Sequence, residues 1–385
     1  MLIERAIQPK LTEMFQKFAV VFLTGPRQSG KTTVAKSCFP KLPYVNLENP
    51  SERQRVMEDP EAFLERFKHG VIIDEAQNYP DIFSYIQVYV DSNNHRPGQF
   101  LLTGSQNFLL NEKISQTLAG RVAILELLPL SYQEIAKDDP TLALFTGGYP
   151  ELYAAHGRIA KTPNDFYPNY IQTYLERDVR QIKNIANLNL FQTLIRLCAG
   201  RVGQTVNYAS LSNDCGLSVP AIKGWLSILE ASYIVYTVYP YFTNFNKRMI
   251  KAPKLYFYDT GLLCSLLGIK DASEVITHYA YGNIFENFVL NEYVKHQCNQ
   301  GERKNVYFLR DQVGHEIDCV IPGSKANCMY EIKAAATFDK SFVKNLTYYS
   351  HLDPTAKGSV IYNGKELFKY KDFNIVPVKQ LDFSK

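Results

Sequence analysis

The run GPRQSGKT at residues 25–32 decides the fold of the first third of this chain. It matches the pattern G-x-x-x-x-G-K-[ST] at every fixed position. The apolar run at residues 19–23 predicts a short strand before it, and residues 32–38 favour a helix after it. A strand, a glycine-containing loop and a helix, in this order, form the context in which the pattern binds nucleotide phosphates.

The glycines of this run explain how it would hold phosphate. Gly25 and Gly30 let the backbone turn so that its N–H groups face inward, and the following helix adds its positive N-terminal end. We expect Lys31 to reach the β- and γ-phosphates and the Thr32 hydroxyl to ligate Mg²⁺. The residues of this segment predicted to bind ATP are Gly25, Pro26, Arg27, Gln28, Ser29, Gly30, Lys31, Thr32 and Thr33.

Two carboxylates follow a second strand, VII at residues 71–73. Its β-branched residues indicate a buried parallel strand, and ligands bind at the carboxyl ends of such strands. We expect Asp74 to hold Mg²⁺ through water and Glu75 to orient the attacking water, which predicts hydrolysis of ATP. A third strand, residues 99–103, ends in TGS, and either Thr103 or Ser105 is expected beside the γ-phosphate.

Composition limits the class of protein. The 385 residues suffice for two or three domains, 46% are hydrophobic, and the net charge of +4 permits nucleic-acid binding without requiring it. No apolar run is long enough for a membrane helix, and the first residues lack the apolar segment of a secretory signal. Seven cysteines without C-x-x-C spacing indicate reduced thiols and no zinc site. We therefore expect a cytoplasmic protein that does not associate with membranes.

Strand and helix signals alternate through residues 1–135, which predicts an α/β domain on a parallel sheet. The expected strands are near 19–24, 43–47, 70–75, 99–103 and 121–127, and the expected helices near 31–39, 51–68, 79–94 and 106–118. The spacing of Ser131 and Glu134 predicts a capping box at the end of this block. Three parts are expected to follow: a helical linker or lid over 136–187, a winged-helix domain over 188–262 and a C-terminal α/β domain over 263–385.

The winged-helix domain is predicted from two short helices joined by a turn that contains glycine. Ser218 is expected to cap the second helix, and the strand at 233–239 to begin a wing. Between residues 241 and 258 there are basic residues and aromatic residues but no acid. This pattern suits contacts with DNA phosphates, or else a solvated hairpin or a basic edge that prevents strand aggregation. The basic residues are Lys247, Arg248, Lys251 and Lys254.

The last domain combines acids with one lysine. Residues two apart on a strand share a face, so Glu331 and Lys333 are expected to point the same way. Asp318 is expected on a neighbouring strand, and Glu286 to approach from a helix over 285–294, predicted to be amphipathic. With Asp318 and Glu331 as Mg²⁺ ligands, this group would cleave phosphodiesters by activating water. Such a fold also occurs without cutting activity, as a DNA-binding module.

Several motifs occur along the chain in an order that is typical of a known protein family. The phosphate loop is followed by VIIDE at 71–75, LTGS at 102–105, GGYP at 147–150, YLERDVR at 174–180, residues 253–262, FEN at 285–287 and EIK at 331–333. In this order the chain resembles a large prokaryotic family of AAA-type ATPases with a C-terminal domain known as domain of unknown function 4143. The resemblance covers nearly the whole chain.

The resemblance implies an AAA-like core, a winged-helix middle and a C-terminal domain similar to restriction-endonuclease-like nucleases. It places Lys31, Thr32, Asp74 and Glu75 in the nucleotide site, and Glu286, Asp318, Glu331 and Lys333 in the nuclease-like pattern. It also implies DNA as the partner, with branched DNA among the candidate substrates. AAA-type ATPases complete their site with an arginine from a neighbouring subunit, so a homo-oligomer is expected. The candidate arginines are Arg121, Arg177 and Arg180.

Three functions stay open on the sequence. The first is an ATP-driven enzyme that acts on DNA, with nucleotide state coupled to DNA binding. The second is a nucleotide-switched DNA- or protein-binding regulator with an inactive nuclease fold. The third is a signalling ATPase whose middle and C-terminal parts bind a protein partner.

Overall fold

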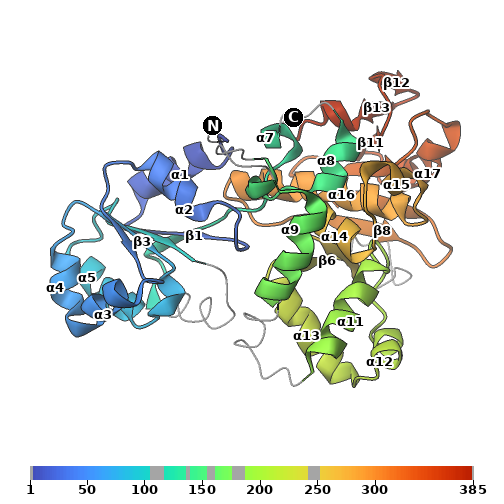
Figure 1. Cartoon of the computed structure of the whole chain (residues 1–385). Helices are drawn as coiled ribbons and strands as arrows, with labels where there is room; N and C mark the ends of the chain where they lie inside the picture. The colour runs from blue at the N-terminus through green and yellow to red at the C-terminus, as the bar shows by residue number, and fades with distance from the viewer. Residues whose placement is uncertain are drawn as a thin grey trace.

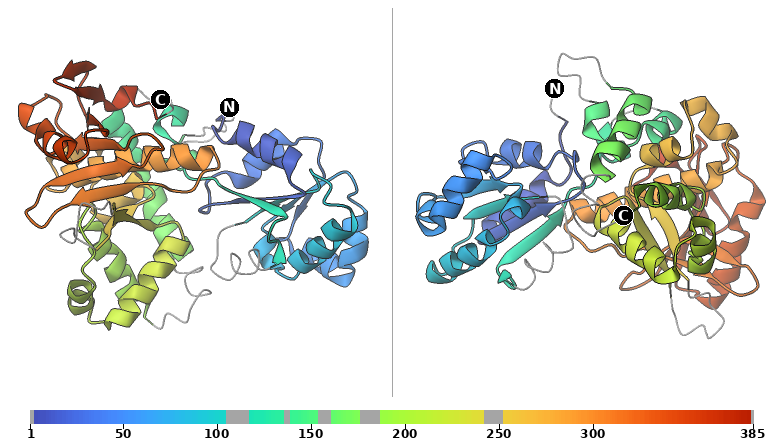
Figure 2. Two further views of the ribbon diagram at one scale, coloured as in Figure 1. Left: turned by 180° about the vertical axis from the view of Figure 1, so that it is seen from behind. Right: turned by 60° about the horizontal axis from the view of Figure 1, so that its bottom comes forward.

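The computed structural model describes residues 3–104, 117–135, 139–153, 161–175, 187–241 and 252–383. Figure 1 shows a domain built on a parallel sheet at the N-terminal end (blue to cyan), helices of the middle residues (green to yellow) and a mixed sheet at the C-terminal end (orange to red). In all the views of Figures 1 and 2 the N-terminal domain lies beside the other two parts.

The N-terminal domain is built on a five-stranded parallel sheet in the order β2-β3-β4-β1-β5. Its strands are β1 (Val20–Thr24), β2 (Tyr44–Asn46), β3 (Val71–Asp74), β4 (Phe100–Thr103) and β5 (Val122–Glu126). Each strand lies within a range predicted from the sequence, because each is a short apolar run between polar turns. The phosphate loop, Asp74 and Thr103 therefore meet at the carboxyl edge of one sheet, where such sheets bind ligands.

Helices cover both faces of this sheet (Figure 1). They are α1 (Gln8–Lys17) and α2 (Lys31–Cys38) on one face, and α3 (Pro50–Glu58), α4 (Pro60–Glu65) and α5 (Ile82–Ser92) on the other. Because side chains alternate along a strand, Leu23 packs toward α1 and α2, whereas its neighbour Phe22 packs toward the other three helices. The predicted single helix at 51–68 is two helices, since the Asp59 carboxylate caps α4 and Pro60 begins it.

A short helix, α7 (Tyr132–Ile135), follows the last strand of this domain. The predicted capping box is confirmed: the Glu134 backbone N–H donates to Ser131 Oγ at 3.3 Å, and the Ser131 N–H donates to Glu134 Oε2 at 2.7 Å. We call residues 128–134 the linker segment. The helix predicted at 106–118 falls almost wholly outside the described residues.

Helices dominate the middle of the chain. They are α8 (Pro140–Thr146), η2 (Pro150–Leu152), α9 (Pro163–Tyr170), the π-helix η3 (Ile171–Leu175), α11 (Leu188–Ala199), α12 (Tyr208–Cys215), α13 (Val219–Ala231), α14 (Thr260–Leu266) and α15 (Ala272–Thr277). Gly147 has φ +76°, and a Cβ there would collide with the Tyr167 hydroxyl and the Asp259 carboxylate. Asp259 accepts hydrogen bonds from the Gly148 N–H and the Tyr167 hydroxyl, both at 2.7 Å. It therefore joins the GGYP turn to residues 253–262.

The C-terminal part is an eight-stranded mixed sheet in the order β12-β13-β11-β10-β9-β8-β6-β7. Its strands are β6 (Val235–Pro240), β7 (Lys254–Phe257), β8 (Tyr307–Arg310), β9 (Glu316–Ile321), β10 (Cys328–Lys333), β11 (Lys357–Tyr362), β12 (Phe368–Tyr370) and β13 (Phe373–Pro377). The remaining elements are α16 (Tyr281–Asn299), η4 (Lys340–Val343), α17 (Lys344–Leu352) and η5 (Val378–Gln380). β6 pairs with β8 in parallel, so the boundary predicted between 262 and 263 divides strands of one sheet.

Helix α16 is buried over most of its length, so the prediction of an amphipathic helix was wrong. It contacts β10, α14 and α15, and its far end contacts β5 of the N-terminal domain. Because it is covered by neighbours on several sides, buried polar residues such as Asn287 and Asn291 hydrogen-bond to other protein groups. Among the described residues, no helix combines the length and the apolar character needed to cross a bilayer.

Candidate functional site

The phosphate loop leaves β1 and enters α2 through unusual backbone conformations. Gly25 has φ +146°, Gly30 has φ +94°, and Gln28 is left-handed at φ +60°. A Cβ at Gly25 would collide with the Leu127 carbonyl oxygen, so this glycine is required by close approach as well as by its φ angle. The loop therefore packs tightly against the chain that follows β5.

The Lys31 ammonium group is buried and turned back onto the loop. Its Nζ donates to the carbonyl oxygens of Pro26 at 2.7 Å and Gly25 at 3.1 Å. Burial lowers the pKa of Lys31 to about 8, although Glu75 and Asp74 oppose the shift. Phosphate oxygens are better acceptors for this cation than the two carbonyls, because they carry charge.

Asp74 is buried, and its carboxylate collects three hydroxyl groups. Thr32 Oγ1 donates to Oδ2 at 2.9 Å, and the Tyr44 hydroxyl donates to the same oxygen at 2.7 Å. Thr103 Oγ1 donates to Oδ1. The structure thus brings together three residues that the sequence predicted for the nucleotide site. Tyr44 was not predicted, since no motif includes it.

Glu75 has a left-handed backbone at φ +54° and accepts a hydrogen bond from Gln77 Nε2. Such conformations cost non-glycine residues about 1–3 kcal/mol and gather at functional sites. Burial raises the pKa of Glu75, while the Lys31 charge acts in the opposite direction. A carboxylate with a raised pKa next to a phosphate loop is suited to accept a proton from water.

These residues fit ATP with Mg²⁺. The Thr32 hydroxyl and the Asp74 carboxylate are hard oxygen ligands of the kind that Mg²⁺ prefers. Within the described part of the chain, the buried Ser29 hydroxyl has no hydrogen-bond partner, and it lies in the loop that would surround phosphate. An orphaned buried hydroxyl in a native fold calls for a ligand or water, so this orphan supports an anion site here.

The sequence offers Ser105 and three arginines as further candidates for the nucleotide site. Ser105, Arg177 and Arg180 lie outside the described residues. Arg121 forms a two-pronged ion pair with Asp91, with Nε–Oδ1 and Nη2–Oδ2 distances of 2.6 and 2.8 Å. An action of Arg121 on a neighbouring subunit's nucleotide would require this pair to open, and it stays a prediction.

Arg5 connects the phosphate loop to the linker segment. The residue is 4% exposed, and its side chain donates from Nη1 to the Ser29 carbonyl at 2.7 Å and from Nη2 to the Leu128 carbonyl at 2.7 Å. Its Nε donates to Glu134 Oε1 at 3.0 Å, and both side chains of this ion pair are buried. The sequence gives no signal for this role, because the acceptors come from distant parts of the chain.

Helix α16 holds the linker segment from the other side. Lys295 Nζ donates to the Leu130 carbonyl at 2.8 Å and to Glu292 at 3.0 Å. Glu292 in turn accepts a hydrogen bond from the Tyr132 N–H at 2.7 Å. The linker segment therefore has one hydrogen-bonded end at the phosphate loop and another at α16.

In the C-terminal sheet, Asp318 on β9 meets Glu331 and Lys333 on β10. Lys333 Nζ lies 3.2 Å from Asp318 Oδ2 and forms a second ion pair with Glu331. The Ile332 N–H donates to Asp318 at 2.7 Å, and Asn345 Nδ2 donates to Glu331 at 3.1 Å. The sequence placed these three charged residues together correctly, and the antiparallel pairing of β9 with β10 explains why.

Glu286 on α16 accepts hydrogen bonds from Lys254 Nζ at 3.1 Å and from the Tyr256 hydroxyl at 2.5 Å. Lys254 also pairs with Glu316 and is only 2% exposed. The prediction that Lys254 contacts DNA is corrected by this burial, since its ammonium group is enclosed between two carboxylates. The other three predicted DNA-binding residues, Lys247, Arg248 and Lys251, lie outside the described residues.

The C-terminal cluster, which comprises Glu286, Asp318, Glu331, Lys333 and Lys254, does not fit a divalent metal in this arrangement. Lys333 bridges Asp318 and Glu331, the two residues predicted to ligate Mg²⁺. Burial alone would raise the pKa of Asp318, but the charges of Lys333 and Lys254 outweigh burial and lower that pKa. For Glu331, burial and the negative charge of Asp318 raise the pKa. Across the described ranges, no three His, Cys, Asp or Glu side chains are grouped to hold a metal ion.

The two short helices predicted before the wing are α12 and α13. Ser218 caps α13 by accepting a hydrogen bond from the Ala221 N–H at 3.3 Å, as expected. β6 follows this helix and pairs with β7 in antiparallel fashion. Lys223 is exposed on α13 and lies over the Tyr208 ring.

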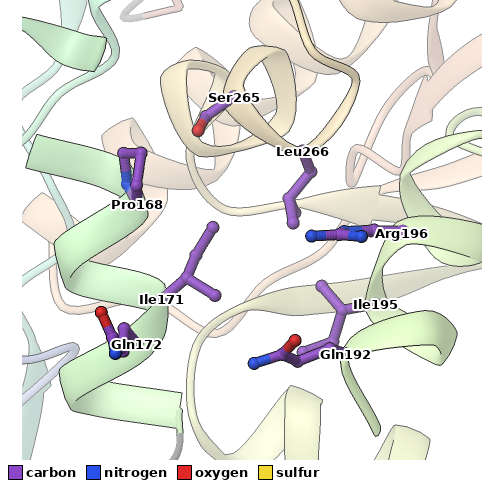
Figure 3. Close-up of a pocket in the computed structure, with 8 residues that line it drawn as sticks. All are labelled: Pro168, Ile171, Gln172, Gln192, Ile195, Arg196, Ser265 and Leu266. Atoms are coloured by element: carbon purple, nitrogen blue, oxygen red, sulfur yellow. The ribbon is translucent and has the colours of Figure 1, made fainter. Parts of the chain in front are cut away.

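A cavity of about 300 Å³ lies between α9, η3, α11 and α14. Figure 3 shows the polar groups of Gln172, Gln192 and Arg196 around it, together with apolar side chains of Ile171, Ile195 and Leu266. None of the residues predicted for nucleotide, DNA or metal lines this cavity.

Three family models match successive parts of the chain. An AAA domain covers residues 17–136, Domain of unknown function (DUF8612) covers 137–273, and Domain of unknown function (DUF4143) covers 281–381. The N-terminal domain is thus a Walker-type AAA ATPase domain. Among solved structures, the Walker-type ATPase PABY2304 of Pyrococcus abyssi aligns with a TM-score of 0.47 and 15% identity, over 69% of this chain and 96% of that chain.

Related proteins occur in bacteria. An uncharacterized protein of Haemophilus influenzae is 24% identical over 212 residues, which is 51% of this chain and 50% of that protein. The uncharacterized protein Rv2008c of Mycobacterium tuberculosis is 30% identical over 385 residues, which is 99% of this chain and 85% of the relative. The chain therefore belongs to the same family as Rv2008c, with an AAA ATPase domain followed by the DUF8612 and DUF4143 domains.

Proposed function

We propose that this protein is a Mg²⁺-dependent ATPase that acts on DNA, and that its nucleotide state controls DNA binding by the middle and C-terminal domains. The observation that carries the ATPase part is the Asp74 carboxylate, which gathers Thr32 and Thr103 beside Glu75 at the phosphate loop. Ligands for phosphate, ligands for Mg²⁺ and a base for water lie at one sheet edge.

Each residue of this site has a defined task. Lys31 exchanges the carbonyls of Gly25 and Pro26 for phosphate oxygens, and the loop N–H groups bind the rest of the phosphate chain. Thr32 and Asp74 would hold Mg²⁺, which would supply positive charge to neutralise the phosphate oxygens. Glu75 orients the attacking water and accepts its proton.

The coupling part of the proposal rests on contacts that run from the phosphate loop to the C-terminal part. Ser29 lies in the phosphate loop, Arg5 donates to the Ser29 carbonyl oxygen, and the same guanidinium group donates to Leu128 and Glu134 of the linker segment. Lys295 and Glu292 then bind that segment to α16. A shift of the phosphate loop on nucleotide binding would therefore move the linker segment, whose hydrogen bonds to Lys295 and Glu292 position α16.

The DNA part rests on the middle of the chain. α12 and α13 have the helix-turn-helix order, with Ser218 and Lys223 exposed on the second helix. The segment after β6 contains Lys247, Arg248 and Lys251 without an acid, which suits phosphate contacts. An arginine that completes the nucleotide site of a neighbouring subunit requires several copies of the chain to assemble. A homo-oligomer is therefore the expected form.

A second function, phosphodiester cleavage, is favoured by one observation. Lys333 forms ion pairs with Asp318 and Glu331, and Glu286 pairs with Lys254, which supports the nuclease-like pattern. The lysines, however, neutralise the carboxylates that a metal would need. We therefore favour a C-terminal domain that has a restriction-endonuclease-like fold and binds DNA without cutting it. In this form the protein is an ATPase whose nucleotide state regulates DNA binding.

Nucleotide-dependent DNA affinity tests the proposal. Fluorescence anisotropy would compare duplex, single-stranded and four-way-junction DNA with no nucleotide, with ADP and with ATP, using Glu75→Gln to hold ATP unhydrolysed. We expect DNA affinity to differ at least about fivefold between the ATP and ADP states, and to fall steeply with salt. Equal affinity in every nucleotide state would remove the coupling. The absence of salt-dependent binding to any DNA would point to a protein partner.

A further inference from the structure

The Asp74 carboxylate has one partner that no nucleotide-binding motif supplies. Its Oδ2 atom accepts hydrogen bonds from Thr32 at 2.9 Å and from the Tyr44 hydroxyl at 2.7 Å. Thr32 is part of the phosphate loop, whereas Tyr44 begins β2 at the edge of the sheet. The Oδ2 atom of Asp74 is therefore held from two sides.

The sheet fixes Tyr44 in this position. β2 runs parallel to β3, with Tyr44 opposite Ile72 and Asn46 opposite Asp74. Because residues two apart on a strand share a face, Tyr44 and Asp74 lie on the same face, one pleat apart. A tyrosine is long enough to cover that distance, so its hydroxyl reaches forward to the carboxylate.

Packing holds the Tyr44 ring as well. The ring packs against the apolar cluster between the sheet and α1 and α2. The Lys36 ammonium group of α2 lies 3.3 Å from the ring centroid, in a cation–π contact. Since α2 begins at Lys31, this contact ties the phenol to the helix that carries the phosphate loop and Thr32.

We propose that Tyr44 is a positioning residue for the Mg²⁺ of the ATPase reaction, whose hydroxyl orients Asp74 toward the metal. The inference rests on the proposed ATPase function and deepens it. Mg²⁺ demands near-ideal octahedral geometry and usually keeps several waters, so the orientation of a carboxylate around it matters. Groups that orient metal ligands through hydrogen bonds typically change metal affinity or activity by about 10- to 100-fold when removed.

Tyr44→Phe is the direct test, because it removes the hydroxyl and keeps the ring and its packing. Binding of a fluorescent ATP analogue would be measured in EDTA and along a Mg²⁺ titration, with circular dichroism melting as the check on folding. We expect metal-free affinity to stay within about twofold and the half-saturating Mg²⁺ concentration to rise about 10- to 100-fold. A direct Mn²⁺ titration followed by electron paramagnetic resonance should show the same loss.

Two variants serve as controls. Tyr85→Phe removes the hydroxyl of another half-buried tyrosine in the same domain and should leave the Mg²⁺ titration unchanged. Lys36→Met removes the cation–π contact while keeping the hydroxyl, and should shift the titration by less than about fivefold.

The outcomes separate this inference from the function on which it rests. A Mg²⁺ titration of Tyr44→Phe that overlays the wild type overturns the role of Tyr44. An equal loss of ATP affinity with and without Mg²⁺ also overturns it, since that loss would report a structural defect. If the wild type itself binds no nucleotide, or binds it equally well in EDTA, the proposed Mg²⁺-dependent ATPase falls and the inference falls with it.

Discussion

Arg5 donates a hydrogen bond to the Ser29 carbonyl oxygen at 2.7 Å, so a residue that precedes the first helix braces the phosphate loop. The same guanidinium group pairs with Glu134 at 3.0 Å, where the linker segment enters α7. A planar fork of donors holds its acceptors in one arrangement. Arg5 therefore sets the position of the linker segment relative to the phosphate loop.

Replacement of Arg5 tests this arrangement. Arg5→Lys keeps the charge, but one ammonium group cannot serve three separated acceptors. We expect a loss of about 1–3 kcal/mol in the free energy of unfolding, measured by urea denaturation, because buried acceptors lose their donors. The difference in DNA affinity between the ATP and ADP states should shrink toward zero. Arg55→Lys, at an exposed position of α3, is the control. Full coupling in Arg5→Lys would show that another path carries the signal.

Glu75→Gln tests the assignment of the catalytic carboxylate. The amide keeps the shape of the side chain but cannot accept the proton of water. We expect ATP turnover to fall by about 10²- to 10⁴-fold, with ATP affinity within about twofold of the wild type. Glu61→Gln, at an exposed position of α4, should leave both quantities unchanged. Turnover of Glu75→Gln at the wild-type rate would require another base.

The pH dependence of ATP binding follows from Lys31. Burial lowers its pKa to about 8 in the nucleotide-free protein, and phosphate favours its charged form, so its pKa is higher in the complex. Below pH 8 the lysine is charged in both states, so it adds no pH dependence to ATP affinity. Above pH 8 binding takes up a proton, so ATP affinity should fall by up to about tenfold per pH unit.

Isothermal titration calorimetry on either side of pH 8 measures this change. Lys31→Arg provides the control, because arginine stays charged throughout this range and its weaker binding should not vary with pH. A wild-type affinity that stays level well above pH 8 would contradict the lowered pKa.

Lys333→Met tests the C-terminal cluster. Removal of the ammonium group leaves Asp318 and Glu331 facing each other without a shared cation. Breaking a buried ion pair in this way typically costs about 3–5 kcal/mol, and the lysine is partly exposed, so we expect about 1–3 kcal/mol in urea denaturation. Lys340→Met, at an exposed position of η4, should cost nothing measurable.

Gel assays of the wild type and of Lys333→Met should show no Mg²⁺-dependent DNA cleavage. Cleavage by the wild type that Lys333→Met abolishes would instead establish a nuclease.

Local patterns predicted much of the N-terminal domain. The five strands are apolar runs between turns, and the phosphate loop and VIIDE are contiguous motifs with fixed chemistry. Strand alternation was also enough to place Glu331 and Lys333 on one face. These features depend on residues near each other in the chain, and such patterns can be read without a structure.

The residues that the sequence did not reveal act across long separations. Tyr44 reaches Asp74 only through the register of β2 against β3. Arg5 finds its acceptors at Ser29, Leu128 and Glu134 only after the domain has folded. Lys254 belongs to a basic run in the sequence, yet β7 places it against α16 and buries it. No local pattern distinguishes a buried lysine with carboxylate partners from an exposed one.

ATP turnover with Mg²⁺, measured in the presence and absence of duplex, single-stranded and four-way-junction DNA, tests the central claim most directly. We predict turnover that EDTA abolishes, that exceeds the Glu75→Gln background by at least about 10²-fold, and that rises with at least one of these DNAs. Turnover no higher than that of Glu75→Gln would contradict the ATPase assignment. Turnover that ignores every DNA, in a protein that binds none of them, would contradict the action on DNA.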